Sequence, residues 1–223
     1  MATLFHGLTP QRVAANLAAV EDEIAAACAA SGRARSDVTL VAAVKYVPAE
    51  DVPVLVAAGI RHAGENRAQA LAEKVALAPG LDWHFIGHIQ SRKVRQIVPH
   101  VSLLHAVCTD SVLEQLGRHA PERTPVLVEV NVSGEGGKSG VAPEALPAFL
   151  DRCRSVARAD VRGLMTMPPL AEDPEASRPW FAELASLAGR HGLPDLSMGT
   201  TQDFTVAIEE GATFVRVGAR LYA

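Results

Sequence analysis

A lysine at the end of an apolar run is the residue of this sequence best placed to do chemistry. Residues 38–44 are small, β-branched or weakly polar, and Lys45 follows them directly. Such a run predicts a buried strand, and α/β proteins place their reactive groups at the carboxyl ends of buried parallel strands. Apolar neighbours can partly desolvate an ammonium group and make the amine available as a nucleophile toward a carbonyl carbon. The alternative is a lysine that simply extends from the strand end into water.

Two further predicted strand ends carry groups suited to bind an anion. Residues 197–201 place hydroxyls beside Gly199, which lets the backbone come close to a ligand, and Arg216 begins the stretch 216–219. The loops after the last two strands of a (β/α)8 barrel commonly hold a phosphate. For 197–201 an ordinary helix cap is the alternative. An amine nucleophile and a phosphate site at one mouth imply a phosphorylated carbonyl ligand, and pyridoxal 5′-phosphate (PLP) has both features.

The elements that would position these groups alternate regularly along the chain. An alanine-rich helix is expected over 9–30, followed by short apolar runs that each precede an amphipathic segment. Eight strands alternating with helices predict a single α/β domain over 1–223, a closed (β/α)8 TIM-type barrel with an extra N-terminal helix. An open doubly wound sheet is the competing architecture, but no Gly-x-Gly-x-x-Gly follows a strand. We expect strands at 38–45, 61–64, 83–87, 103–107, 125–132, 161–165, 196–198 and 213–217, and helices at 48–58, 66–77, 90–98, 110–119, from 143, at 174–190 and at 204–210.

Composition limits the class of protein. The chain has 223 residues, 48% of them apolar and 4% aromatic, and a net charge of −4, which gives no general attraction to nucleic acid or to anionic membranes. Three widely spaced cysteines favour reduced thiols over a disulfide scaffold or a zinc site. No signal peptide or membrane-spanning run is evident. We therefore expect a soluble cytoplasmic protein, and a monomer.

Several motifs in a fixed order connect the chain, from about residue 9 to its end, with a known family. It resembles the pyridoxal phosphate homeostasis proteins, small relatives of the amino-terminal barrel of alanine racemase. The motifs are Val44-Lys45, Gly64-Glu65-Asn66, Trp83-His84-Phe85-Ile86-Gly87 with Gln90 and Lys93, Asn131-Val132-Ser133, Lys138-Ser139-Gly140, Arg162-Gly163-Leu164-Met165, Leu196-Ser197-Met198-Gly199 and Val215-Arg216-Val217-Gly218.

The resemblance implies a cofactor site at the mouth of the barrel. In it, Lys45 would hold PLP as an internal aldimine, the seventh and eighth loops would bind the phosphate, and Arg216 would lie next to the pyridine nitrogen. The family usually reads Ser-Met-Gly-Met-Ser-x-Asp at the seventh loop and Gly-Thr after the arginine, so the present chain departs from it at 200–202 and at Ala219. One phosphate-binding hydroxyl is therefore expected to be missing, and Thr200 could supply another. The cofactor-binding residues expected are Lys45, Asn66, Met165, Ser197, Gly199, Thr200, Thr201, Arg216, Gly218 and Ala219.

The same resemblance favours a carrier over a catalyst. A protonated Arg216 beside the pyridine nitrogen disfavours a second positive charge there, and an unprotonated ring is a poor electron sink. A racemase also needs a second acid/base, in that family a tyrosine from a separate domain, whereas the tyrosines here are Tyr46 and Tyr222. We expect storage, delivery and protection of PLP without turnover, with PLP-dependent client enzymes as partners. A weak PLP-dependent amino-acid racemase and a regulatory interaction module are the alternatives.

Other signals are set aside. Residues 134–139 look like a nucleotide-binding loop, but Val132 occupies the position where the motif requires a glycine. His84 and His88 are four apart, which on a strand separates them by about 13 Å, too far to share an ion, and no metal site is expected. The basic cluster 91–95 is interpreted as a solvated face or a docking surface for acidic partners.

Two residues near the strand ends allow two interpretations each. Glu65 could be a partner that orients Lys45 or Arg216, or a carboxylate at a helix start. Met165 could pack in the core or line the cofactor site.

Overall fold

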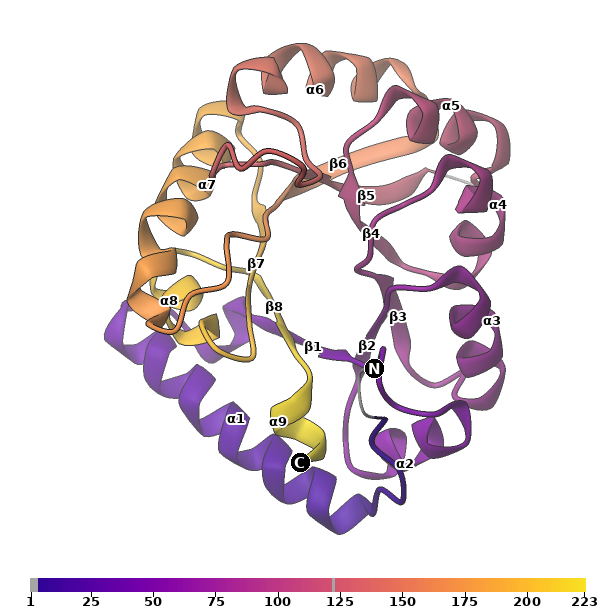
Figure 1. The fold of residues 1–223 in the computed structure, drawn as a ribbon, viewed down its shortest axis with the longest axis vertical. Helices are drawn as coiled ribbons and strands as arrows, with labels where there is room; N and C mark the ends of the chain where they lie inside the picture. The colour runs from indigo at the N-terminus through magenta and orange to yellow at the C-terminus, as the bar shows by residue number, and fades with distance from the viewer. Residues whose placement is uncertain (1–3, 122) are drawn as a thin grey trace.

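Eight parallel strands form a closed barrel in the computed structural model, which describes residues 4–121 and 123–223 (Figure 1). Each strand pairs with the next along the chain, and β8 closes the ring on β1. The predicted (β/α)8 architecture is therefore confirmed. The strands are β1 (Thr39–Ala43), β2 (His62–Glu65), β3 (Asp82–Phe85), β4 (Leu103–Val107), β5 (Thr124–Glu129), β6 (Ala159–Met165), β7 (Asp195–Thr200) and β8 (Phe214–Val217).

The helices surround this ring. The N-terminal helix begins as predicted, because the Thr9 hydroxyl accepts from the backbone N–H of Arg12 at 3.4 Å and Pro10 occupies the first turn. A short C-terminal helix, α9, was not predicted. The helices are α1 (Pro10–Ala30), α2 (Val52–Ala57), α3 (Ala68–Leu77), α4 (Val94–Ile97), α5 (Asp110–His119), α6 (Leu146–Ser155), α7 (Arg178–His191), α8 (Phe204–Glu209) and α9 (Ala219–Tyr222).

Several predicted helices are shorter than expected because they begin with a 3-10 turn, including 174–190, where Pro174–Ser177 precedes α7. The 48–58 segment divides into a 3-10 turn, Ala49–Asp51, and α2, and the 90–98 segment divides into a 3-10 turn, Ser91–Lys93, and α4. A third 3-10 turn, Val98–His100, follows α4 directly. Pro99 lacks the N–H that would continue the helical hydrogen bonds, so α4 ends before it.

The core has two layers. The larger lies between the strands and the helices, and the smaller fills the inside of the barrel with Leu103, Ala106, Leu127 and Met165. Gly163 allows β6 and β7 to approach closely, since a Cβ there would lie 1.8 Å from the carbonyl oxygen of Asp195. Among the described residues, no helix combines the length and the apolar character needed to cross a membrane.

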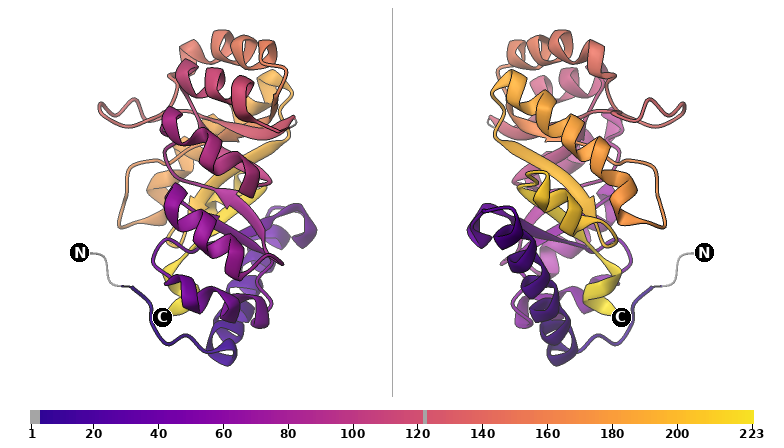
Figure 2. Two further views of the ribbon diagram at one scale, coloured as in Figure 1. Left: turned by 90° about the vertical axis from the view of Figure 1, so that its right-hand side faces the viewer. Right: turned by 90° about the vertical axis from the view of Figure 1, so that its left-hand side faces the viewer.

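The carboxyl ends of the strands open toward one side of the barrel. Figure 2 shows the loops after β5 and β6 extending from the barrel on this side. A β-bulge interrupts β7 at this end, because Ser197 pairs with Phe214 whereas Thr200 pairs with Arg216. The barrel therefore presents irregular backbone where ligands of such barrels bind.

Candidate functional site

A cavity of about 430 Å³ lies at the carboxyl ends of the strands and contains Lys45. Seven of the ten predicted site residues line it, namely Lys45, Asn66, Thr200, Thr201, Arg216, Gly218 and Ala219. Ser197, Gly199 and Met165 are not on its wall. Residues that were not predicted for the site also line it, among them Phe5, Ile86, Met167 and Tyr222.

Lys45 lies two residues beyond the end of β1, in a turn. Val44 holds this turn, because its N–H donates to the carbonyl of Gly64 at 2.9 Å and its carbonyl accepts from Val47 at 3.0 Å. The Lys45 side chain is half-buried, and its Nζ lies 5.0 Å from the centre of the Tyr46 ring. The amine is thus held at the mouth by the backbone that precedes it.

A buried ion pair lies beneath this turn. Lys74 Nζ lies 2.5 Å from Glu65 Oε2 and donates to the Val44 carbonyl at 2.7 Å, and both charged side chains are at most 3% exposed. Sequence reasoning missed Lys74, because a lysine in an amphipathic helix normally faces water. The pair ties β2 and α3 to the turn that carries Lys45.

Glu65 has the second of its two predicted roles. Its Oε1 accepts from the backbone N–H of Asn66 at 2.7 Å and of Arg67 at 3.1 Å, at the start of α3. It pairs with Lys74 and not with Lys45 or Arg216. Glu65 is therefore a carboxylate at a helix start, and it reaches Lys45 only through Lys74 and Val44.

Arg216 forms the floor of the cavity. Its guanidinium is buried and donates to Ser197 Oγ, to the Thr166 carbonyl at 3.0 Å and to Met167 Sδ at 2.9 Å. Burial lowers the pKa of Arg216 to about 10, against the opposing effect of the charges of Asp203 and Glu129. The side chain is therefore still protonated at neutral pH.

Ser197 supports the site from below instead of facing the cavity. Its fully buried hydroxyl accepts from Arg216 and lies 2.8 Å from Nδ1 of His105. Burial holds the pKa of His105 well below its usual value, so the ring is neutral. Ser197 therefore fixes the guanidinium to the barrel interior.

The two threonines of the seventh loop have different partners. The Thr200 N–H and hydroxyl both donate to Asp203 Oδ1, at 2.7 and 3.1 Å. The Thr201 hydroxyl instead accepts from the N–H of Gly218 at 3.0 Å, which leaves its own hydrogen free to donate. Of the two, Thr201 is the better placed to bind an anion.

Gly199 shapes the loop without lining the cavity. Its φ is +86°, and a Cβ there would lie 2.5 Å from that of Ala207. The bulge that brings Thr200 opposite Arg216 therefore depends on a residue without a side chain.

Met165 lies inside the barrel, in contact with Leu103, Ala106 and Leu127. It borders a different hollow, with Glu129 and Ser139, and the methionine that reaches the Lys45 cavity is Met167. Side chains alternate between the two faces of a strand, and Met165 is on the face that points into the barrel. Of its two sequence interpretations, the packing role agrees with this location.

Two polar atoms at the cavity are buried without a hydrogen-bond partner among the described residues. They are Asn66 Oδ1 and Tyr222 Oη, both on residues of the cavity wall. Buried polar atoms without a partner are costly, so these two are candidates to bind a ligand. Lys45 and Arg216 supply the positive charge of the wall, and no carboxylate, histidine or thiol lies among the described residues that line it.

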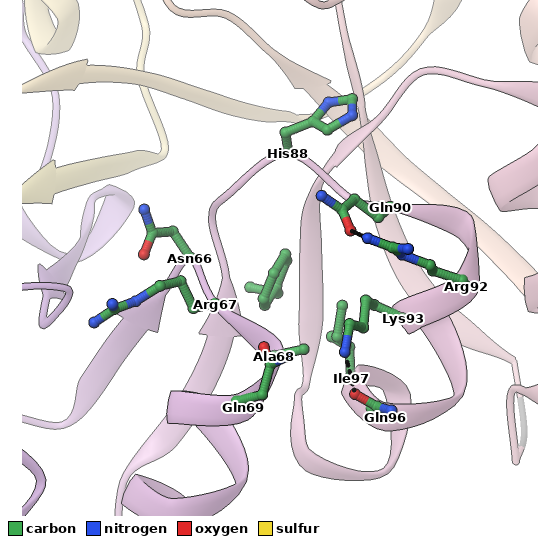
Figure 3. Close-up of a pocket in the computed structure, with 11 residues that line it drawn as sticks. Asn66, Arg67, Ala68, Gln69, His88, Gln90, Arg92, Lys93, Gln96 and Ile97 are labelled. Carbon is green, nitrogen blue, oxygen red and sulfur yellow. Dashed lines mark hydrogen bonds between the residues drawn. The ribbon is translucent and has the colours of Figure 1, made fainter.

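A second hollow of about 580 Å³ adjoins the first at Asn66 (Figure 3). Arg67 lies beside Asn66 on one wall, and Arg92 and Lys93 lie on the facing wall. Arg92 donates to Gln90, and Lys93 donates to Gln96. The basic cluster of the sequence therefore lines a depression next to the Lys45 cavity.

Comparison with known proteins agrees with this geometry. A family model described as the N-terminal domain of alanine racemase matches residues 15–223. The chain is 41% identical over 217 residues to the pyridoxal phosphate homeostasis protein of Pseudomonas aeruginosa, with 94% of each chain covered. It is 38% identical over 217 residues to that of Aquifex aeolicus, covering 92% of this chain and 95% of the relative.

Solved structures give the same result. PipY of Synechococcus elongatus PCC7942, with PLP bound, has a TM-score of 0.82 at 30% identity, over 95% of this chain and all of PipY. Alanine racemase of Clostridium difficile 630 is 12% identical with a TM-score of 0.74, over 95% of this chain and 56% of the racemase, which shows a shared fold alone. With its barrel, its motifs and these relatives in agreement, the chain belongs to the family of pyridoxal phosphate homeostasis proteins.

Proposed function

We propose that this protein binds PLP in the Lys45 cavity and serves intracellular PLP homeostasis by storing, protecting and delivering the cofactor. The observation that carries the proposal is the presence of Lys45, Thr201 and Arg216 on one wall that contains no carboxylate among its described residues. A wall with this charge favours an anionic phosphate ester. The PLP bound to PipY, a relative at 30% identity, supports the same assignment.

The residues present fit this cofactor. The cavity volume is within the range of ordinary small-molecule sites, roughly 300–1,000 Å³. Asn66 Oδ1 and Tyr222 Oη are buried and have no hydrogen-bond partner in the described part of the chain, as expected for atoms that bind polar groups of a ligand. When bound, PLP supplies an aldehyde that reacts with amines and a ring that can accept electron density.

Each wall residue then has a role. Lys45 would hold the aldehyde carbon through its amine, and Thr201, Gly218 and Ala219 would bind the phosphate. Arg216 would face the pyridine nitrogen, while Ser197 and Gly199 hold the arginine and the seventh loop in place. Asn66 and Thr200 complete the wall, and Met165 packs behind it.

The wall supports binding without turnover. A protonated ring nitrogen favours carbanion chemistry on this cofactor, and racemisation also needs an acid/base on the face opposite the lysine. Arg216 remains protonated and disfavours a proton on the nitrogen. Burial, with a contribution from the charge of Glu65, raises the pKa of Tyr222 far above neutrality, which makes its hydroxyl a poor base.

The binding assignment is tested with purified protein and PLP. Wild-type protein is expected to develop the visible absorption band of a lysine-bound PLP, and borohydride reduction followed by peptide mass spectrometry is expected to locate the adduct at Lys45. Lys93→Ala is the matched control, since Lys93 lies outside the cavity. An adduct at another lysine, or an unchanged band in Lys45→Ala, would refute the proposal.

The absence of turnover is tested with the loaded protein and L-alanine or L-serine in deuterium oxide. We expect no racemisation and no exchange of the α-hydrogen beyond that caused by free PLP. Sustained exchange above that level would identify a PLP-dependent racemase or related enzyme instead. We place the protein in the cytoplasm as a monomer that serves PLP-dependent client enzymes, and its three free cysteines support a reducing compartment.

A further inference from the structure

Three potential metal ligands converge at the amino end of the barrel, opposite the Lys45 cavity. His62 is the first residue of β2, and Asp82 and His84 are the first and third residues of β3. His62 pairs directly with Asp82 in the strand register, and residues two apart on a strand share a face. Both imidazoles and the carboxylate therefore lie on the inner face of one strand pair.

The distances between their ligand atoms match a metal site. His62 Nδ1 lies 3.3 Å from Asp82 Oδ2 and 3.2 Å from His84 Nε2, and all three atoms lie within 4.8 Å of one another. Tetrahedral zinc with bonds of 2.0–2.2 Å places its ligand atoms about 3.3–3.6 Å apart. The 3.3 Å separation falls within this range, the 3.2 Å separation lies just below it, and the third is at most 4.8 Å.

We propose that His62, Asp82 and His84 form a site for a divalent ion of the zinc class. Two imidazole nitrogens and one carboxylate select zinc, cobalt or a similar ion over magnesium or calcium, which prefer oxygen ligands. His62 and Asp82 are 32% and 47% exposed, so a water molecule can complete the coordination from outside. His62 also borders a hollow of about 290 Å³ at this end of the barrel.

The residues behind the site orient the buried ligand. His84 Nδ1 lies 2.9 Å from His105 Nε2, and His105 Nδ1 lies 2.8 Å from Ser197 Oγ. An ion on His84 Nε2 places the ring hydrogen on Nδ1, where His105 accepts it, and His105 then donates to the serine. Such a donor relation behind a ligating imidazole is typical of metal sites.

The site was not predicted from the sequence, because the spacing there pairs His84 with His88. His62 and His84 are 22 residues apart, and only the pairing of β2 with β3 brings them together. The ion would tie β2 to β3, because its ligands come from both strands. This role agrees with the amino end of such barrels, where residues serve stability and not catalysis. This inference goes beyond the proposed PLP function and does not depend on it.

The test is a titration of tag-free, chelator-treated protein with Co²⁺, followed by displacement with Zn²⁺. We expect one equivalent of Co²⁺ per chain with the visible bands of a four- or five-coordinate ion, and a higher thermal unfolding midpoint with Zn²⁺. His62→Ala and Asp82→Asn are expected to weaken binding by at least about tenfold. Both residues are partly exposed, so these variants are expected to fold.

A control variant distinguishes this site from a second group of possible metal ligands. His88, Cys108 and Glu129 lie together near the carboxyl end of the barrel. Cys108→Ser removes the thiol of that group and is expected to leave Co²⁺ binding unchanged. The proposal is overturned if no stoichiometric binding occurs, if it persists in both His62→Ala and Asp82→Asn, or if Cys108→Ser abolishes it.

Discussion

Replacing Lys74 with methionine tests the role of the buried ion pair. Lys74 and Glu65 are 3% and 0% exposed, and the ammonium lies 2.5 Å from the carboxylate. Methionine fills a similar volume but leaves the Glu65 charge buried without its partner, a change that costs about 3–5 kcal/mol. Asn66 and Arg67 still donate to Glu65 Oε1, so the lower half of that range applies. A loss of about 3–4 kcal/mol lowers the thermal midpoint of a chain of this length by roughly 10 °C.

The measurement is urea unfolding of wild type, Lys74→Met, Glu65→Gln and the double variant. In the double variant the amide oxygen can still accept at the start of α3 and no charge is buried, so it is expected to be more stable than Lys74→Met alone. Lys93→Met is the control, because among the described residues the hydrogen bond of Lys93 is a 3.3 Å contact with Gln96 near the surface. It should change stability by less than about 0.5 kcal/mol. A loss below about 1 kcal/mol in Lys74→Met, or a double variant less stable than it, would refute the reasoning.

Three further outcomes follow from single positions. Gly163→Ala is expected to abolish soluble folded protein, because its Cβ would lie 1.8 Å from a backbone oxygen. Gly189→Ala should fold as judged by circular dichroism, since, apart from its chain neighbours and the backbone of its own helix, no atom of the described residues lies within 4 Å of a Cβ there. Tyr222→Phe should leave the stability of PLP-free protein in urea within about 0.5 kcal/mol, since its buried hydroxyl has no partner among the described residues, and should weaken PLP binding in a titration; a large loss of stability would contradict this. Burial raises the pKa of Cys108 to about 11, so iodoacetamide labelling near pH 8 should be about a hundredfold slower than for a thiol of pKa 9 and should accelerate about tenfold per pH unit toward pH 11. Equal labelling rates in native and urea-unfolded protein would contradict the last expectation.

The barrel and much of its mouth could be predicted because they depend on local patterns. Alternating apolar runs and amphipathic segments determine the strand count, and the groups at strand ends converge whenever such a barrel closes. Lys45, Thr201 and Arg216 are brought together for this reason. Boundaries were less accurate where prolines and 3-10 turns divide helices, since hydrophobic periodicity does not detect these interruptions.

What could not be predicted depends on contacts between elements. Lys74 is buried only because Glu65 on β2 and the carbonyl of Val44 accept from it. Met165 lies at a strand end, but whether it faces the barrel interior or the surrounding helices depends on the strand register. A shift of one residue reverses the direction of every side chain on a strand, and sequence patterns rarely determine strand ends that closely.

A chain of hydrogen bonds through His62, His84, His105 and Ser197 links the amino end of the barrel to Arg216. At the amino end, His62 Nδ1 faces both the Asp82 carboxylate and His84 Nε2. Without an ion, the favourable arrangement places a hydrogen on His62 Nδ1, because its lone pair would otherwise face a negative charge. His84 then accepts at Nε2, carries its hydrogen on Nδ1 and donates to His105.

The proposed ion leaves the donor and the acceptor of the His84–His105 hydrogen bond unchanged. An ion on His84 Nε2 also puts the ring hydrogen on Nδ1, so His105 still accepts at Nε2 and donates from Nδ1 to Ser197. The guanidinium of Arg216 can only donate, and Ser197 Oγ accepts from it in both cases. The floor of the Lys45 cavity is therefore the same with and without the ion, so zinc should raise the stability of the barrel while the affinity for PLP stays constant.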